Sequence, residues 1–341
     1  MATDLSEEQA TWVHHVSSVL AGKPDDLRLD TIKVSVLETD GAALLARRER
    51  RRGLVIPREH GAWGLLLVPI ATGAGLAFRE SVHVLPLILL LTGALALFWA
   101  RTPFESLLGT SAMRARTRGE RRLVMNFIAG LGVVAAVSLG ALLWNGKNSE
   151  LWPLGIVAGL AFVVQGLLKQ LGRRTPAISP VAEDGRIWSA RGIHRLRMLS
   201  EVVGIVGLTA AAPAAYYVIT GRFDLTAWIL WVANLIFAGN QIHYVQLRLH
   251  TARVEGLRAK LAQGWGFAAG QAGLTVALTM ACAEGLLPKL ASLAFAPLLF
   301  RGWFYFIQER KPLVVRRLGW TELAQGIAFG VLIIATLSPA L

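Results

Sequence analysis

The sequence has little of what disulfide and metal chemistry require. Its 341 residues include one cysteine, Cys282, so one chain can form neither an internal disulfide nor a thiolate metal site. It also contains no HExxH, GxSxG, P-loop or CxxC motif. The signatures of the common hydrolases, NTPases and zinc enzymes are therefore missing, and we expect neither a metal nor a cofactor.

Charge is scarce as well. Charged residues make up 17% of the chain and hydrophobic residues 54%, which is too apolar for a soluble protein unless the apolar residues face lipid in long blocks. The formal net charge of +13 falls in loops and carries no recognisable nucleic-acid motif. We therefore expect membrane lipids, and no nucleic acid, as partners.

The apolar residues do form long blocks, each able to cross or nearly cross a hydrocarbon core about 30 Å thick. The predicted spans are residues 61–78, 82–100, 123–144, 151–168, 199–219, 225–245, 265–283, 288–307 and 319–338. This pattern predicts an all-α fold, a polytopic integral membrane helical bundle of about nine helices in residues 51–341. Residues 1–50 form a polar N-terminal extension, with a helix expected over about 6–20 and a strand or hairpin arm over 30–41.

Basic residues are distributed unequally between alternate loops. The segment before the first span and the loops after the second, fourth, sixth and eighth spans together hold 27 Lys and Arg. The other four loops hold 4. Basic residues are retained in the cytoplasm, so the N-terminus is predicted inside and the C-terminus outside. The long loops are then cytoplasmic, and a site built from loops belongs to that face.

Polar residues follow one face of the predicted span 225–245 toward its inner end. Asn234, Gln241 and Arg248 recur at intervals of seven, which stacks them on one side of a helix. Asn240, His243 and Tyr244 extend this polar face near the inner end. Polar side chains at this depth turn into the bundle, where they either hydrogen-bond other helices or contact a ligand.

Two further groups could contribute to such a site. Arg301 lies six residues from the inner end of its span, where it either snorkels to the surface or faces inward toward a carboxylate or an anionic headgroup. Glu105, Glu201 and Glu322 lie at the same boundary and are candidate ion-pair partners.

The second group opens the first span. Arg58, Glu59, His60 and Trp63 stand ahead of an apolar run that is interrupted by glycines and Pro69. Because freed backbone groups need partners in a membrane, this run predicts a helix that lines a cytoplasm-facing cavity.

These residues carry a resemblance to a known family. The stretch PREHGAWGLLLVP, the RTP after the second span, HYVQLRLH and VVRRLGWTELAQGIAFGVL resemble the YwiC-like family of bacterial membrane proteins, whose signature is the tetrad HGAW, here His60 to Trp63. The resemblance covers about residues 54–338 and implies the bacterial cytoplasmic (inner) membrane. The family has no established activity.

The topology is also similar to that of the UbiA-type prenyltransferase superfamily. Those enzymes hold magnesium with aspartate-rich motifs after the second and sixth spans, since a hard cation takes oxygen ligands. Here the loops RTPFESLLGTSAMRARTRGERR and VQLRLHTARVEG contain no aspartate and are rich in arginine. The resemblance therefore implies a fold that would bind an anion directly, without the metal.

The leading hypothesis is a membrane protein that binds an amphiphilic anionic small molecule or lipid in a cytoplasm-facing cavity, with an isoprenoid or quinone-like molecule as one candidate. A diverged UbiA-type transferase is one form of it, in which His60 or His243 would serve as acid or base because histidine titrates near neutral pH. The alternatives are a transporter or permease, and a non-catalytic membrane subunit. The ligand-binding candidates are Arg58, Glu59, Trp63, Asn240, Gln241, Arg248 and Arg301.

Overall fold

The computed structural model describes residues 45–56, 60–111, 113–144, 150–174, 187–252, 254–309 and 314–337. The chain divides into two compact units, Met1–Leu54 and Val55–Leu341. Of the first unit, residues 45–54 are described and are helical. The predicted helix over 6–20 and strand over 30–41 lie outside the described residues.

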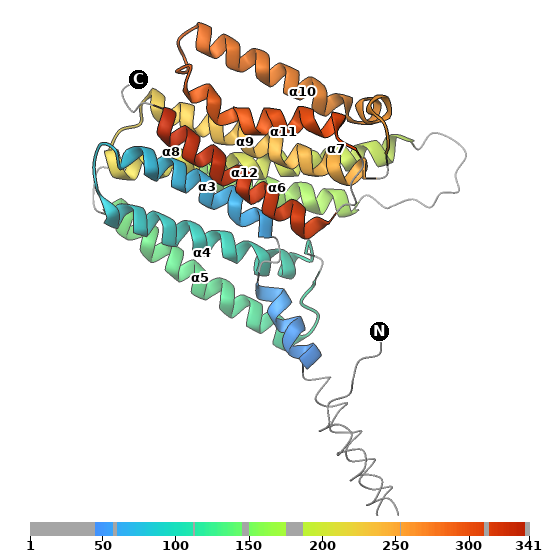
Figure 1. Ribbon diagram of the computed structural model, residues 1–341. Helices are drawn as coiled ribbons and strands as arrows, with labels where there is room; N and C mark the ends of the chain where they lie inside the picture. Colours follow the sequence, from blue (N-terminus) through green and yellow to red (C-terminus); the bar gives the residue numbers. More distant parts are fainter. Residues whose placement is uncertain are drawn as a thin grey trace, which may run out of the picture. The chain divides into compact units, whose positions relative to one another are not determined.

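The second unit is built of helices (Figure 1), and the described ranges contain no strand, which confirms the all-α prediction. Its elements are α3 (His60–Ala77), α4 (Val84–Leu108), α5 (Arg118–Trp144), α6 (Leu151–Arg174), α7 (Ile187–Thr209), α8 (Ala211–Thr220), α9 (Leu225–His250), α10 (Leu257–Ala283), the 3-10 helix η1 (Ala291–Phe295), α11 (Ala296–Ile307) and α12 (Val315–Thr336).

Seven helical segments in the described ranges are long and apolar enough to cross a membrane, so the chain is a multi-pass membrane protein. Two of the nine predicted spans correspond to shorter apolar segments, Trp63–Ala77 and Ala291–Ile307. The predicted span 199–219 falls across two helices, the C-terminal half of α7 and nearly all of α8. They separate near Pro213, which has no N–H to continue the ladder of α7.

Outward faces of the bundle are apolar. Val133 and Val137 on α5, and Ile156 and Leu160 on α6, each expose more than half of their surface. Apolar surface of this extent is unfavourable in water and suits lipid. Helix α5 is capped at its N-terminal end, where the backbone N–H of Glu120 donates to Thr117 Oγ1 over 3.1 Å.

Helix α3 lies between α8 and α12 (Figure 1) and is continuous through Pro69. Its glycines allow close contact with these neighbours. A Cβ at Gly73 would collide with the carbonyl oxygen of Ala212, and one at Gly75 would approach Ile334 Cδ1 to 2.5 Å. The glycines that the sequence analysis associated with a cavity wall therefore serve helix packing at these two positions.

Gly73→Ala is expected to destabilise the bundle by about 1–3 kcal/mol, because the new methyl group meets backbone atoms that cannot rotate away. The measurement is thermal unfolding of detergent-purified protein. Gly140→Ala is the matched control, since a Cβ at Gly140 meets no atom within 4 Å. Equal melting temperatures for the two variants would contradict the packing role of Gly73.

Candidate functional site

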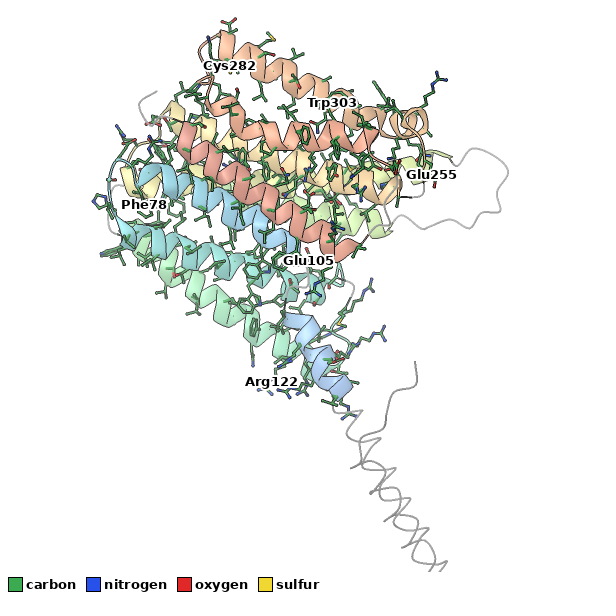
Figure 2. The ribbon with its side chains drawn as sticks, in the orientation of Figure 1. Phe78, Glu105, Arg122, Glu255, Cys282 and Trp303 are labelled. Atoms are coloured by element: carbon green, nitrogen blue, oxygen red, sulfur yellow. The ribbon has the colours of Figure 1, made fainter. Side chains whose placement is uncertain are left out.

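The candidate site lies at the end of the bundle where α9 and α11 finish and α10 and α12 begin. In Figure 2, Glu255 marks this end, while Phe78 and Cys282 lie at the opposite end. Nine residues form what we call the basic cluster: Asn240, Gln241, Tyr244 and Arg248 of α9, Lys260 of α10, Arg301 and Tyr305 of α11, and Glu322 and Gln325 of α12.

An ion pair between α11 and α12 forms the centre of the cluster. Arg301 Nη1 donates to Glu322 Oε1, and the two side chains are only 12% and 8% exposed. The guanidinium carbon of Arg301 also lies 4.0 Å from the centre of the Tyr244 ring. A buried pair of this kind is stable only when further contacts satisfy both groups.

Helix α9 supports this pair through residues spaced at helical intervals. Gln241 Nε2 donates to the backbone oxygen of Glu322 over 2.7 Å. Asn240, Tyr244 and Arg248 follow one another at intervals of four, which aligns them on one face. The Glu322 carboxylate lies within electrostatic reach of both Arg301 and Arg248.

Tyr305 joins the remaining cations to the cluster. Arg248 and Lys260 lie 5.2 Å and 5.0 Å from the centre of its ring. Its hydroxyl hydrogen-bonds the Thr251 hydroxyl, and Lys260 Nζ donates to the Gln308 carbonyl over 2.6 Å. Lys260 is only 4% exposed, so little of its side chain reaches solvent.

Several buried polar atoms of the cluster have no hydrogen-bond partner in the described part of the chain. The donors are Arg248 Nε and both Nε and Nη2 of Arg301, and the acceptors are Asn240 Oδ1, Glu322 Oε2 and Gln325 Oε1. Buried polar groups are almost always satisfied by protein groups, ordered water or a bound molecule, and these open atoms are concentrated on three adjacent helices.

The other sequence-predicted residues are placed differently. His243 packs edge to face on Phe267, with ring centres 5.3 Å apart, and no hydrogen bond joins it to the cluster among the described residues. Trp63 packs on Phe98 at 4.9 Å, on the α4 side of α3. His60 begins α3, but its side chain is outside the description, and Arg58 and Glu59 lie outside the described residues.

The other boundary carboxylates form structural contacts elsewhere. Glu105 accepts from Lys169 over 2.8 Å and from Arg101 over 3.0 Å, which connects α4 to α6. Glu201 of α7 accepts from Gln246 of α9. Among the described residues, no group of three or more His, Cys, Asp or Glu is arranged to hold a metal ion.

Sequence reasoning missed three residues of the cluster. Tyr305 follows Arg301 by four residues, and Gln325 follows Glu322 by three, so helical spacing would have placed each beside its charged neighbour. Lys260 had no such signal, because it reaches the cluster from α10 through tertiary packing alone.

Comparison with known proteins finds one family model that matches part of the chain. Residues 56–179 match the family model described as YwiC-like protein. This YwiC-like segment includes the HGAW tetrad and ends before α7, so all nine residues of the basic cluster lie beyond it. No curated protein and no solved structure matches the chain.

Removing one member of the Arg301–Glu322 pair is expected to destabilise the protein by about 3–5 kcal/mol, because the remaining charge is left buried. Glu322→Ala should therefore lower the melting temperature strongly, whereas the double variant Arg301→Met with Glu322→Leu should recover most of the loss. Thermal unfolding in detergent measures both. Arg316→Met, at an exposed position of α12, is the control and should change little. A Glu322→Ala variant as stable as this control would refute the pair's structural role.

Proposed function

We propose that the chain is an inner-membrane protein that binds an amphiphilic anion in the basic cluster. The observation that carries this proposal is the orientation of Arg301. Its Nη1 is occupied by Glu322, while Nε and Nη2, which lie along one edge of the planar guanidinium, are both open. That edge is the one that grips two oxygens of a carboxylate or phosphate side by side.

The charge balance of the cluster supports an anionic ligand. Arg301 pairs with Glu322, and two further cations, Arg248 and Lys260, lie against the ring of Tyr305 on the same helix as Arg301. Uncompensated charge is costly among membrane-spanning helices, so an excess of buried positive charge favours a bound anion. A purely structural ion pair would need no further cations in the same group of side chains.

The amphiphilic character of the ligand follows from where the cluster lies. Arg301, Gln241 and Glu322 belong to helices whose outward faces are apolar. A molecule with an anionic head and an apolar tail could place the head on Arg301 and keep the tail in lipid. An isoprenoid, quinone-like or phospholipid ligand would meet this requirement, and a diverged UbiA-type transferase would be one such protein.

A transporter is the second candidate function, and the same ion pair favours it. Ionisable residues inside membrane helices commonly mark solute or proton pathways. In that case Arg301 and Glu322 would bind a solute that is released on the other side. Solute accumulation in proteoliposomes that is lost in Arg301→Lys would favour transport over simple lipid binding.

The proposed topology has nine crossings, with the N-terminus and the basic cluster on the cytoplasmic side. The division of 27 Lys and Arg against 4 between alternate loops supports it. The shorter segments Trp63–Ala77 and Ala291–Ile307 would then cross the membrane with help from flanking residues.

This topology is tested by cysteine labelling in intact cells, after Cys282 is replaced by alanine. A single cysteine introduced at Arg222 should react with a membrane-impermeant maleimide from outside, whereas one at Glu255 should react only after the cells are opened. Labelling of both positions from outside would contradict the nine-span arrangement.

Ligand binding is tested with Arg301→Lys, which keeps the charge and removes the bidentate edge. The amount of anionic amphiphile that copurifies with this variant is expected to fall by about tenfold or more, because a pair of charge-assisted hydrogen bonds is lost. Native mass spectrometry of the detergent-purified protein, with lipid extraction, measures the copurified molecule. Arg316→Lys is the matched control on an exposed arginine. Equal copurification with both variants would exclude the basic cluster as the binding site.

A further inference from the structure

The open atoms of the basic cluster include acceptors as well as donors. This combination limits the chemical class of ligand that could satisfy them. An anion alone can satisfy the free N–H groups of Arg248 and Arg301. It cannot satisfy the open oxygens of Glu322, Asn240 and Gln325, because it offers them no proton.

Glu322 Oε2 is the decisive atom among these acceptors. The open oxygens of Asn240 and Gln325 belong to amides, which could present their NH₂ groups after a rotation of 180°. A carboxylate has two oxygens and no donor in its charged form, so no rotation removes its need for a proton donor. The Glu322 side chain is 8% exposed, so bulk water is largely kept from it.

A molecule that occupies the Arg301 edge lies beside Glu322, since both groups belong to one ion pair, and it can supply the donor that Oε2 lacks. The ligand then carries an oxyanion and, close to it, a hydroxyl or another neutral donor. A phosphate ester fits the oxyanion best, because three N–H groups from two guanidiniums remain open and a phosphate offers more oxygens than a carboxylate.

Resting on the proposed function, we infer that the basic cluster recognises a phosphate ester whose alcohol part bears a free hydroxyl group. The phosphate oxygens accept from the open edge of Arg301 and from Arg248, and the hydroxyl donates to Glu322 Oε2. A phosphoglycerol headgroup on a lipid and a free polyol phosphate share this chemistry.

Two matched pairs of probes test the inference on the full-length, detergent-purified protein. Phosphatidylglycerol and phosphatidylmethanol have the same charge and tails and differ in the headgroup hydroxyls. Glycerol 3-phosphate and methyl phosphate form the corresponding soluble pair. Apparent dissociation constants for all four are measured by native mass spectrometry titration, with phosphatidylcholine as the lipid that has neither net charge nor a headgroup donor.

The hydroxyl-bearing member is expected to bind about tenfold more tightly than its partner in at least one pair, as for one hydrogen bond to a charged group. A preference in the lipid pair identifies a lipid headgroup, and a preference confined to the soluble pair identifies a free polyol phosphate. In Glu322→Gln the preference should fall to about twofold or less, whereas Glu309→Gln, at an exposed position after α11, should keep it.

The failures are distinguishable. In one result, phosphatidylglycerol and phosphatidylmethanol bind equally, both bind far more tightly than phosphatidylcholine, and the soluble pair shows no difference. The hydroxyl assignment is then wrong, and the proposed anion site is retained. If none of the anionic probes binds better than phosphatidylcholine, the proposed function fails with it. The wild-type comparison decides between these results even where Glu322→Gln does not fold.

Discussion

The buried pair between Arg301 and Glu322 constrains the rest of the site. Removing two charges from water is costly, and their mutual attraction offsets that cost only when the remaining polar atoms also find partners. Tyr244 supplies a ring face to the guanidinium, and Gln241 fixes the backbone of α12 beside Glu322. The pair therefore determines how α9, α11 and α12 meet, and the open edge of Arg301 is held in place by contacts on its other edge.

The opposite end of the bundle is held by a different polar group. Tyr216 Oη lies 3.2 Å from Glu80 Oε1 and 3.3 Å from Asp224 Oδ2, and Arg222 pairs with Glu80. Because Asp224 also caps α9 at Ala227 N, this group ties α8 and the end of α3 to the start of α9. Helix α9 is thus anchored at both ends, which leaves little freedom for the residues of the basic cluster to shift along its axis.

The sequence was informative where one helix carries the signal. The interval of seven among Asn234, Gln241 and Arg248 predicts a shared face, and all three side chains contact other elements or the cluster on that side. The all-α class followed from the apolar blocks in the same way. The partner of Arg301 did not follow, since Glu105, Glu201 and Glu322 were equivalent candidates until the packing of α11 on α12 selected Glu322.

The structural role of the glycines could not be predicted from the sequence either, because it depends on which helix packs against each of them. Gly73 and Gly75 predict a weak helix when α3 is considered alone, yet each faces a neighbour that leaves no room for a side chain. Glycines of α12 also lie against α3: Gly326 faces Val68, and Gly330 faces Thr72. Thr72 in turn accepts a hydrogen bond from Asn234 of α9 over 3.0 Å.

These contacts connect the YwiC-like segment to a site that lies outside it. Helix α3 belongs to the matched segment, and it packs on α12, which carries Glu322, and bonds to α9, which carries Arg248. A Cβ on Gly326 would approach Val68 Cγ2 to 3.1 Å, so the separation of α3 and α12 is set by small residues rather than by adaptable side chains. Substitutions on this face of α3 would therefore displace the cluster's carboxylate, and the matched segment and the cluster are physically coupled through one helix interface.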